Sequence, residues 1–307
     1  MDIKYFNRHE QKVEREKVYG DAAVKWLYQT TSGRLMGRLV ASPVVSHLYG
    51  ELQSAGFSRR KVAPFVESFS IKMDDFLPGE GKEYLLETGG DVSDWYESFN
   101  EFFIRRFRPG VRNIEQRPEL MPAFSEARYF GHEQIDDKIT IPVKGADLRA
   151  QELVARNRWA KYFEGGPFLV ARLCPVDYHR FHFPDNAKVL DRYPVHGALH
   201  SVNPIALKER SNIFISNKRE VTILDSENFG LLAYIEVGAT CVGKIVQTYR
   251  GDQVERGQEK GYFLFGGSTV VLLGQPGLWK PHEEILKHTS EGLEVYSKLG
   301  FPIAEKL

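Results

Sequence analysis

The second half of the chain is a succession of short segments rich in β-branched and aromatic residues, with turn residues between them. The segments begin after about residue 120 and read KITIPVKG, PFLVARLCP, YHRFHFP, EVTILDS, GLLAYIEVG, CVGKIVQTY, GYFLF and STVVLLG. Short runs of this kind, spaced by turns, are typical of a sheet-forming core. We therefore predict a β-rich core over residues 116–307, and this prediction limits the fold more than any other feature does.

The first part of the chain has a different pattern. Residues 20–50 mix apolar residues with a few basic ones, as an amphipathic helix does. Further on, SFNEFFIRRF carries Ser98 and Glu101 at the spacing of a helix capping box, and Pro109-Gly110 predicts the end of that helix. We predict a helical N-terminal region over residues 1–115. A helical front and a β-rich back make an α+β protein.

Charge and cysteine content exclude several classes of protein. The 307 residues include 41 basic and 41 acidic side chains, so the net charge of zero argues against a nucleic-acid partner. Two cysteines form no disulfide framework, which is typical of a reducing compartment. The charged N-terminus predicts no signal peptide, and no apolar stretch approaches the roughly 18 residues of a membrane span. We expect a cytoplasmic protein, either soluble or peripheral to a membrane.

A pair of histidines is the first candidate for chemistry. Residues 172–184, RLCPVDYHRFHFP, hold His179 and His182 close to Asp177 and Arg180. Histidine changes charge near neutral pH, which suits proton transfer. A spacing of three does not match the same-face period of a strand, although a turn or bulge could bring the rings together. Structural roles, acid–base chemistry and metal binding stay open, and no third metal ligand stands out.

The second candidate is Gly266-Gly267-Ser268-Thr269, in the middle of GYFLFGGSTVVLL (261–273). Glycine inside a strand usually marks a bulge, a bend or a close backbone approach. The pattern is neither a Gly-x-Ser-x-Gly nucleophile elbow nor a P-loop. A serine hydroxyl can instead attack the carbonyl of the residue before it, and a preceding glycine has the least steric objection. A histidine can supply the base that this attack needs.

That attack would convert the peptide bond into an ester. Elimination from the ester would break the chain and leave a dehydroalanine, which hydrolyses to a pyruvoyl group. A pyruvoyl group forms a Schiff base with an amine and accepts electrons as a carboxylate leaves. A Gly-Ser pair alone is too common to favour this chemistry over a simple strand bend.

Several segments, in order along the chain, resemble the phosphatidylserine decarboxylase family. VERGQEKGYFLFGGSTVVLL resembles its processing region, and ARLCPVDYHRFHFP resembles its Asp-Tyr-His-Arg-x-His segment. The processing region is matched by Gly257, Glu259, Gly261, Phe263 and Gly267-Ser268-Thr269. Further similar segments are FNEFFIRRFRPGVRNI, VHGALHSVNPIAL (195–207) and YIEVGATCVGKI (234–245). The resemblance covers most of residues 1–275.

The resemblance implies a carboxy-lyase that converts phosphatidylserine to phosphatidylethanolamine and CO₂. It implies self-cleavage between Gly267 and Ser268, so that a pyruvoyl cofactor derived from Ser268 begins the small chain and forms the Schiff base with the lipid amine. His182 would be the base for cleavage, and His179 would assist decarboxylation. The large and small chains would stay together as a heterodimer, which can dimerise again.

The acidic member of the family's cleavage machinery has no simple counterpart in LMPAFSEARYFG (120–131). Alignment on Pro122-Ala123 puts Phe124 in its place, whereas alignment on Arg128 puts Glu126 there. We favour Glu126, because a carboxylate fixes the tautomer of an imidazole that acts as a base. A surface charge is the alternative role for Glu126. If Phe124 is the true counterpart, processing is in doubt.

A lipid substrate also favours contact between residues 20–50 and the cytoplasmic side of a membrane, with core packing of that segment as the alternative. Two other functions stay open. One is pyruvoyl-dependent decarboxylation of a free amino acid, and the other is a lipid-binding paralogue that is never processed. A histidine-based metalloenzyme would require metal in the purified protein.

Overall fold

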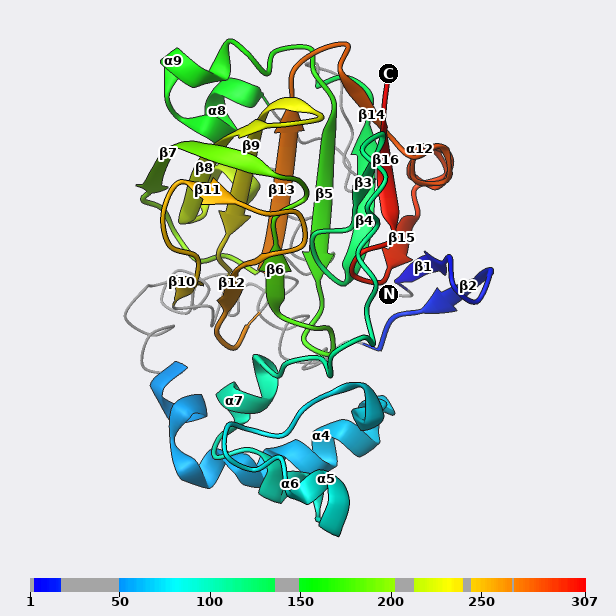
Figure 1. Cartoon of the computed structure of the whole chain (residues 1–307), viewed down its shortest axis with the longest axis vertical. Helices are drawn as coiled ribbons and strands as arrows, with labels where there is room; N and C mark the ends of the chain where they lie inside the picture. The colour runs from blue at the N-terminus through cyan, green and yellow to red at the C-terminus, as the bar shows by residue number, and fades with distance from the viewer. Residues whose placement is uncertain (1–2, 18–49, 136–148, 202–212, 240–243, 267) are drawn as a thin grey trace, which may run out of the picture.

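The computed structural model describes residues 3–17, 50–135, 149–201, 213–239, 244–266 and 268–307. These residues form a ten-stranded mixed sheet, two three-stranded sheets and a set of short helices, as the α+β prediction requires. Figure 1 shows helices α4–α7 gathered at one end of the strands, with α7 nearest to them. No helix in the described ranges is long and apolar enough to cross a bilayer.

The ten-stranded sheet is the main element of the fold. Its strands, in spatial order, are β11 (Gln253–Val254), β7 (Ala187–Val195), β8 (Arg219–Ser226), β9 (Gly230–Val237), β13 (Ser268–Gly274), β5 (Phe168–Leu173), β4 (Ala127–His132), β15 (Glu294–Ser297), β1 (Lys4–Asn7) and β2 (Lys12–Arg15). Only the β1–β15 pair is parallel among the pairings of this sheet. The central strands β5 and β13 are buried along their whole length, as the apolar runs FLVA in β5 and VVLL in β13 predict.

The two small sheets pack near the ends of the large one. One contains β10 (Ile245–Gln247), β12 (Glu259–Phe263) and β6 (Arg180–His182), and the other contains β14 (Trp279–Pro281), β16 (Pro302–Lys306) and β3 (Leu120–Pro122). The remaining helices are α8 (Ala150–Val154), α9 (Asn157–Ala160), α11 (Ile213–Ser216) and α12 (Glu283–Ser290). One apolar core joins all three sheets.

The helical region has a separate, strongly aromatic core. It consists of η1 (Gly56–Lys61), α4 (Val62–Phe69), η2 (Met73–Asp75), α5 (Leu85–Thr88), α6 (Val92–Trp95) and α7 (Phe99–Phe103). Phe99, Phe102 and Phe103 of α7 are buried in this second core, and so are Tyr178 and Phe265 from the β-rich part. The second core therefore extends to the two segments that the sequence marks for chemistry.

The start of the chain differs from the helical expectation. Residues 4–15 form the hairpin β1–β2 at the edge of the large sheet, where β1 pairs with β15 and Phe6 packs against the main core. A tight hairpin of this kind becomes stable only against a partner strand, and here that strand comes from the far end of the chain. Most of residues 20–50, where an amphipathic helix is predicted, lies outside the described residues. The boundary at residue 115 stays a prediction.

The chain after residue 268 is interleaved with the chain before it. Strand β13 lies between β9 and β5, and β15 lies between β4 and β1. Both of these strands therefore have hydrogen-bonded neighbours from the N-terminal side of residue 268, and so does β16, which pairs with β3.

Candidate active site

The GYFLFGGSTVVLL run is two strands rather than one. Strand β12 ends at Phe263 in a small sheet, and β13 begins at Ser268 in the large sheet. Gly266 has a φ of 144°, a backbone conformation that residues with a Cβ atom rarely adopt. The glycines therefore mark the point where the chain crosses between sheets. Gly267 itself lies outside the described residues.

Ser268 is fully buried at the first position of β13, opposite Leu173 of β5. Its hydroxyl lies 3.1 Å from Nδ1 of His179. The same imidazole has its Nε2 2.9 Å from the carbonyl oxygen of Cys174. A carbonyl only accepts hydrogen bonds, so Nε2 carries the proton and Nδ1 presents a lone pair to the Ser268 hydroxyl.

The surroundings of His179 keep its ring neutral. Burial lowers the pKa of His179 well below 6.5, and the positive charge of Arg105 lowers it further, against the opposing effect of the Cys174 carbonyl. The ring of Phe103 stacks on the imidazole with centroids 3.7 Å apart. A neutral, oriented imidazole with its free lone pair toward a hydroxyl is the arrangement of a general base.

The Cys174 carbonyl is itself fixed by a buried turn. Asp177 accepts from the Cys174 amide at 2.6 Å through its carboxylate, and the Asp177 amide donates to the Cys174 carbonyl at 2.8 Å. Arg128 donates to the same carboxylate at 2.6 Å. Burial raises the pKa of Asp177 to about 6 despite this guanidinium. The Asp177 side chain thus affects Ser268 indirectly: it fixes the turn whose Cys174 carbonyl orients His179.

His182 faces a different part of the molecule. Its Nδ1 lies 2.9 Å from the Gly257 carbonyl and its Nε2 lies 3.3 Å from the Tyr178 hydroxyl. Burial lowers the pKa of His182, with the Gly257 carbonyl and Glu259 acting in the opposite direction. Both ring nitrogens are occupied, and the described residues show no hydrogen bond between His182 and Ser268. The two histidines do not meet at one site.

Glu126 is buried in an ion pair away from both histidines. Arg112 donates to its two carboxylate oxygens at 2.6 and 3.0 Å, and the Tyr296 hydroxyl donates at 2.9 Å. Within the described part of the chain, no hydrogen bond joins Glu126 to His179 or His182. The alternative of a surface charge is wrong, because Glu126 is only 6% exposed; the catalytic role stays a prediction.

The residue next to His182 is instead Phe124. The His182 amide donates to the Phe124 carbonyl at 2.8 Å. The Phe124 side chain is fully buried against Tyr129 and Tyr234. The backbone of Phe124 therefore lies beside that of His182, and its ring packs into the main core.

Helix α7 supplies site residues that sequence reasoning missed. Phe103 stacks on His179, and Arg105 just beyond the helix donates to the carbonyls of Val176 and Asp177. The capping box in this segment predicts the start of a helix, and this is confirmed, because Ser98 accepts a hydrogen bond from the Glu101 amide. The sequence signal that points to these residues is the high density of aromatic side chains in the segment. A helix of five residues is stable only when its side chains pack on both sides.

Comparison with known proteins identifies the family of the chain. A family profile described as phosphatidylserine decarboxylase matches residues 99–296. Proteins named phosphatidylserine decarboxylase proenzyme match along nearly their whole length. That of Clostridium kluyveri is 38% identical over 306 residues, covering 99% of both chains. That of Clostridium novyi is 38% identical over 307 residues, covering 99% of this chain and all of the relative. That of Clostridium tetani is 35% identical over 305 residues, covering 99% and 98%.

These matches define the chain first as a carboxy-lyase. More particularly, it belongs to the phosphatidylserine decarboxylase family.

Proposed function

We propose that this chain is a self-processing proenzyme that decarboxylates phosphatidylserine. The observation that carries the proposal is the Ser268 hydroxyl, held 3.1 Å from the lone-pair nitrogen of a buried, neutral His179. The glycine-rich crossing immediately before Ser268 supports it, because an attack on the preceding carbonyl requires a bent backbone. The family and the proenzyme names of the relatives support the same conclusion.

The proposed cleavage uses the chain's own atoms. His179 Nδ1 takes the proton of Ser268 Oγ as this oxygen bonds to the carbonyl carbon of Gly267. The C–N bond then breaks, and the proton passes to the amide nitrogen, which becomes the free amine of an ester. Loss of the Ser268 α-proton and rupture of its Cβ–Oγ bond release the Gly267 carboxylate and leave dehydroalanine. Tautomerisation to an imine, addition of water and loss of ammonia then give the pyruvoyl group.

The site fits a pyruvoyl group made in this way. Among the described residues, the Ser268 hydroxyl has one hydrogen-bond partner, and that partner is in the correct tautomer to act as a base. Once formed, the group supplies an electrophilic carbonyl that serves as an electron sink for decarboxylation. His179 stays beside it, held by Cys174 and Phe103, and is positioned to donate or accept a proton there.

The geometry favours His179 as the cleavage base, whereas the resemblance implies His182. In the uncleaved chain, His182 uses both ring nitrogens on Gly257 and Tyr178, and its cross-strand partner Glu259 is bound by Arg180. Glu126 then stabilises the structure through Arg112 rather than taking part in cleavage.

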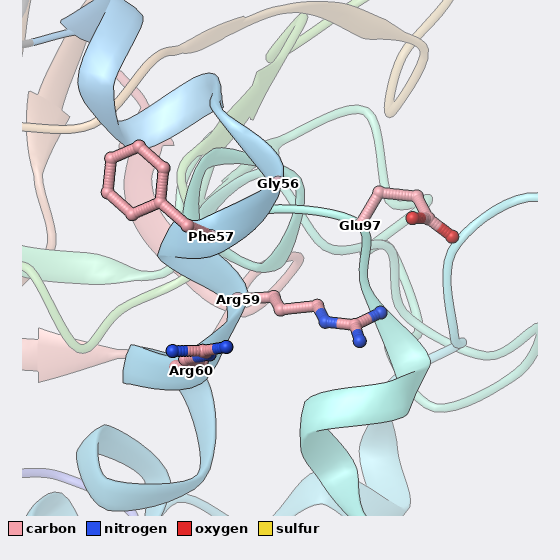
Figure 2. A pocket seen from close by; sticks show the side chains of 5 residues that line it. All are labelled: Gly56, Phe57, Arg59, Arg60 and Glu97. Carbon is pink, nitrogen blue, oxygen red and sulfur yellow. The ribbon is translucent and has the colours of Figure 1, made fainter.

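The lipid substrate requires contact with a membrane surface, and we propose that the peripheral contact includes residues 52–61, on the cytoplasmic side. Leu52 and Phe57 are 46% and 60% exposed, and the basic residues Arg59–Lys61 follow directly. A cavity of about 260 Å³ lies at this segment. Figure 2 shows the residues that line it, which include Phe57, Arg59, Arg60 and the acidic Glu97. Exposed apolar side chains beside basic ones bind anionic headgroups in an interface.

Intact mass under denaturing conditions tests the processing. We expect two chains that separate between Gly267 and Ser268, with the small chain blocked at its start, and one unbroken, inactive chain for Ser268→Ala. Assays of the processed protein on phosphatidylserine and on free amino acids then identify the substrate. A product from free amino acids alone would contradict the lipid proposal. An unbroken wild-type chain that still binds phosphatidylserine vesicles would indicate a lipid-binding paralogue.

Vesicle co-sedimentation tests the membrane surface. We expect Arg59→Glu combined with Arg60→Glu to lower binding to vesicles that contain phosphatidylserine, because each basic residue near an anionic surface adds about 1 kcal/mol. Lys188→Glu combined with Arg192→Glu, at exposed positions of β7, is the control with the same change of charge. Equal binding of the double variant and the control would contradict this surface.

A further inference from the structure

Asn100 of α7 connects two parts of the molecule through one buried side chain. It is 4% exposed, and its Oδ1 accepts from the Phe265 amide at 2.7 Å. Its Nδ2 donates to the Ser54 hydroxyl at 2.8 Å and to the Gly50 carbonyl at 3.3 Å. Only a carboxamide offers an acceptor and two donors in this geometry, so neither aspartate nor leucine could make all three bonds.

The bond to Phe265 fixes the chain just ahead of the proposed cleavage point. The Phe265 ring is buried against Phe99 and Phe103, at centroid distances of 5.1 and 5.0 Å. On the other side, pairing of β13 with β5 fixes Ser268. The peptide bond before Ser268 therefore lies in a connection of two residues between two fixed points.

The opposite end of the Asn100 side chain is equally well held. Ser54 lies in helical residues 50–54, and Ser58 of η1 accepts from the Phe99 amide at 2.9 Å. Ser58 also donates to the Gln53 carbonyl at 2.8 Å. The position of Asn100 is thus determined by the segment that carries Leu52 and Phe57.

We propose that Asn100 is a positioning residue for self-cleavage, which it promotes by fixing Phe265 relative to the Ser268 hydroxyl. The inference rests on the proposed self-processing. Near-attack geometry is demanding, since a displacement of about 1 Å can cost about 100-fold in rate. Loss of the Phe265 bond lets the connection relax, so we expect the acyl shift to slow by about 10- to 100-fold.

The test is a time course of chain breakage after cell-free synthesis, measured by intact mass, for wild type, Asn100→Ala, Asn100→Asp and Ser54→Ala. Asn100→Asp keeps an oxygen for the Phe265 amide but loses the donors to Ser54 and Gly50. Ser54→Ala loses only the far contact. We expect Asn100→Ala to be slow, and the other two to agree with each other within about threefold.

Hydroxylamine adds a readout that a loss of stability alone would not change. It cleaves esters but leaves amides intact, so it reports whether the acyl shift has occurred. In Asn100→Ala we expect little hydroxylamine-released product, because the shift itself is slowed. Breakage of Asn100→Ala at the wild-type rate, or ester formation at that rate, would overturn the inference.

Two further outcomes separate the inference from the proposed function. If the wild-type chain stays unbroken, both the proposed processing and the inference are wrong. If the wild type is cleaved and Asn100→Ala is cleaved at the same rate, only the inference is wrong. If Asn100→Ala shows no cooperative thermal unfolding, the test rests on Asn100→Asp, which keeps the acceptor for the Phe265 amide. If Asn100→Asp then breaks more than tenfold more slowly than Ser54→Ala, the contact with Phe265 is not the cause of the effect and the inference is overturned.

Discussion

His179 and His182 lie three residues apart, yet their surroundings share almost nothing. His179 is tied to a backbone carbonyl on one side and faces Ser268 on the other, with Phe103 stacked on its ring. His182 is held between Gly257 and Tyr178, with Phe124 next to it. Two identical side chains in one motif therefore have different hydrogen-bond partners, and these set a different tautomer for each ring.

Replacement of each histidine by alanine tests this contrast most strongly. We expect His179→Ala to slow chain breakage by about 10²- to 10⁴-fold, the usual contribution of a general base. His182→Ala should have a smaller effect, because its ring does not contact Ser268. Intact mass over time measures both. The reverse order of effects would return the base role to His182, as the resemblance implies.

The stacked ring beside His179 gives the next largest effect. Phe103→Leu keeps an apolar side chain but loses the flat face, and an aromatic pair contributes about 0.5–1.5 kcal/mol. We expect breakage to slow by about 3- to 10-fold. Phe65→Leu, in the same aromatic core but on α4, is the matched control. Equal slowing in both variants would mean that the effect comes from core packing.

Glu126 should matter for stability rather than for cleavage. We expect Glu126→Gln to cleave within about threefold of wild type, while its free energy of unfolding falls by about 1.5–3 kcal/mol, the contribution of hydrogen bonds to a charged group. Chemical denaturation and the mass time course measure the two effects. A cleavage defect above about tenfold would instead support the sequence-based assignment of Glu126 to the catalytic set.

The pH dependence of cleavage should be the weakest effect. Because burial lowers the pKa of His179 well below 6.5, its imidazole stays neutral and able to accept a proton from pH 8 down to pH 6. We expect a constant rate over that range. Unfolding lets the histidine bind a proton below about 6.5, so stability should decline as the pH falls below that value and be unaffected above it. A rate that halves at pH 6.5 would indicate a histidine titrating at its ordinary pKa.

The sequence predicted the sheet-forming half of the chain well because the apolar runs FLVA in β5 and VVLL in β13 are typical of buried strands. It also singled out Ser268 and His179, which the structure places 3.1 Å apart, although the resemblance gave the base role to His182. The β1–β2 hairpin was missed because its partner β15 lies at the opposite end of the chain.

The orientation of the site could not be read from residue types. The Cys174 carbonyl sets the tautomer of His179, and a backbone carbonyl is present at every residue. The contact between Asn100 and Phe265 joins residues 165 positions apart. Glu126 was assigned by its charge, but the nearby Arg112 competes for that carboxylate.

The interleaving of β13 and β15 with earlier strands imposes an order of events on the life of the molecule. If the bond before Ser268 breaks, the fragment 268–307 stays in place through strand pairing and core packing on both sides. A chain that broke before it folded would have to bring two separate pieces together by diffusion. The proposed cleavage is therefore expected to follow folding, and a cleaved chain would show that the molecule had once folded correctly. Once unfolded, a processed molecule refolds only in a concentration-dependent reaction, so its lifetime is set by how slowly it first unfolds.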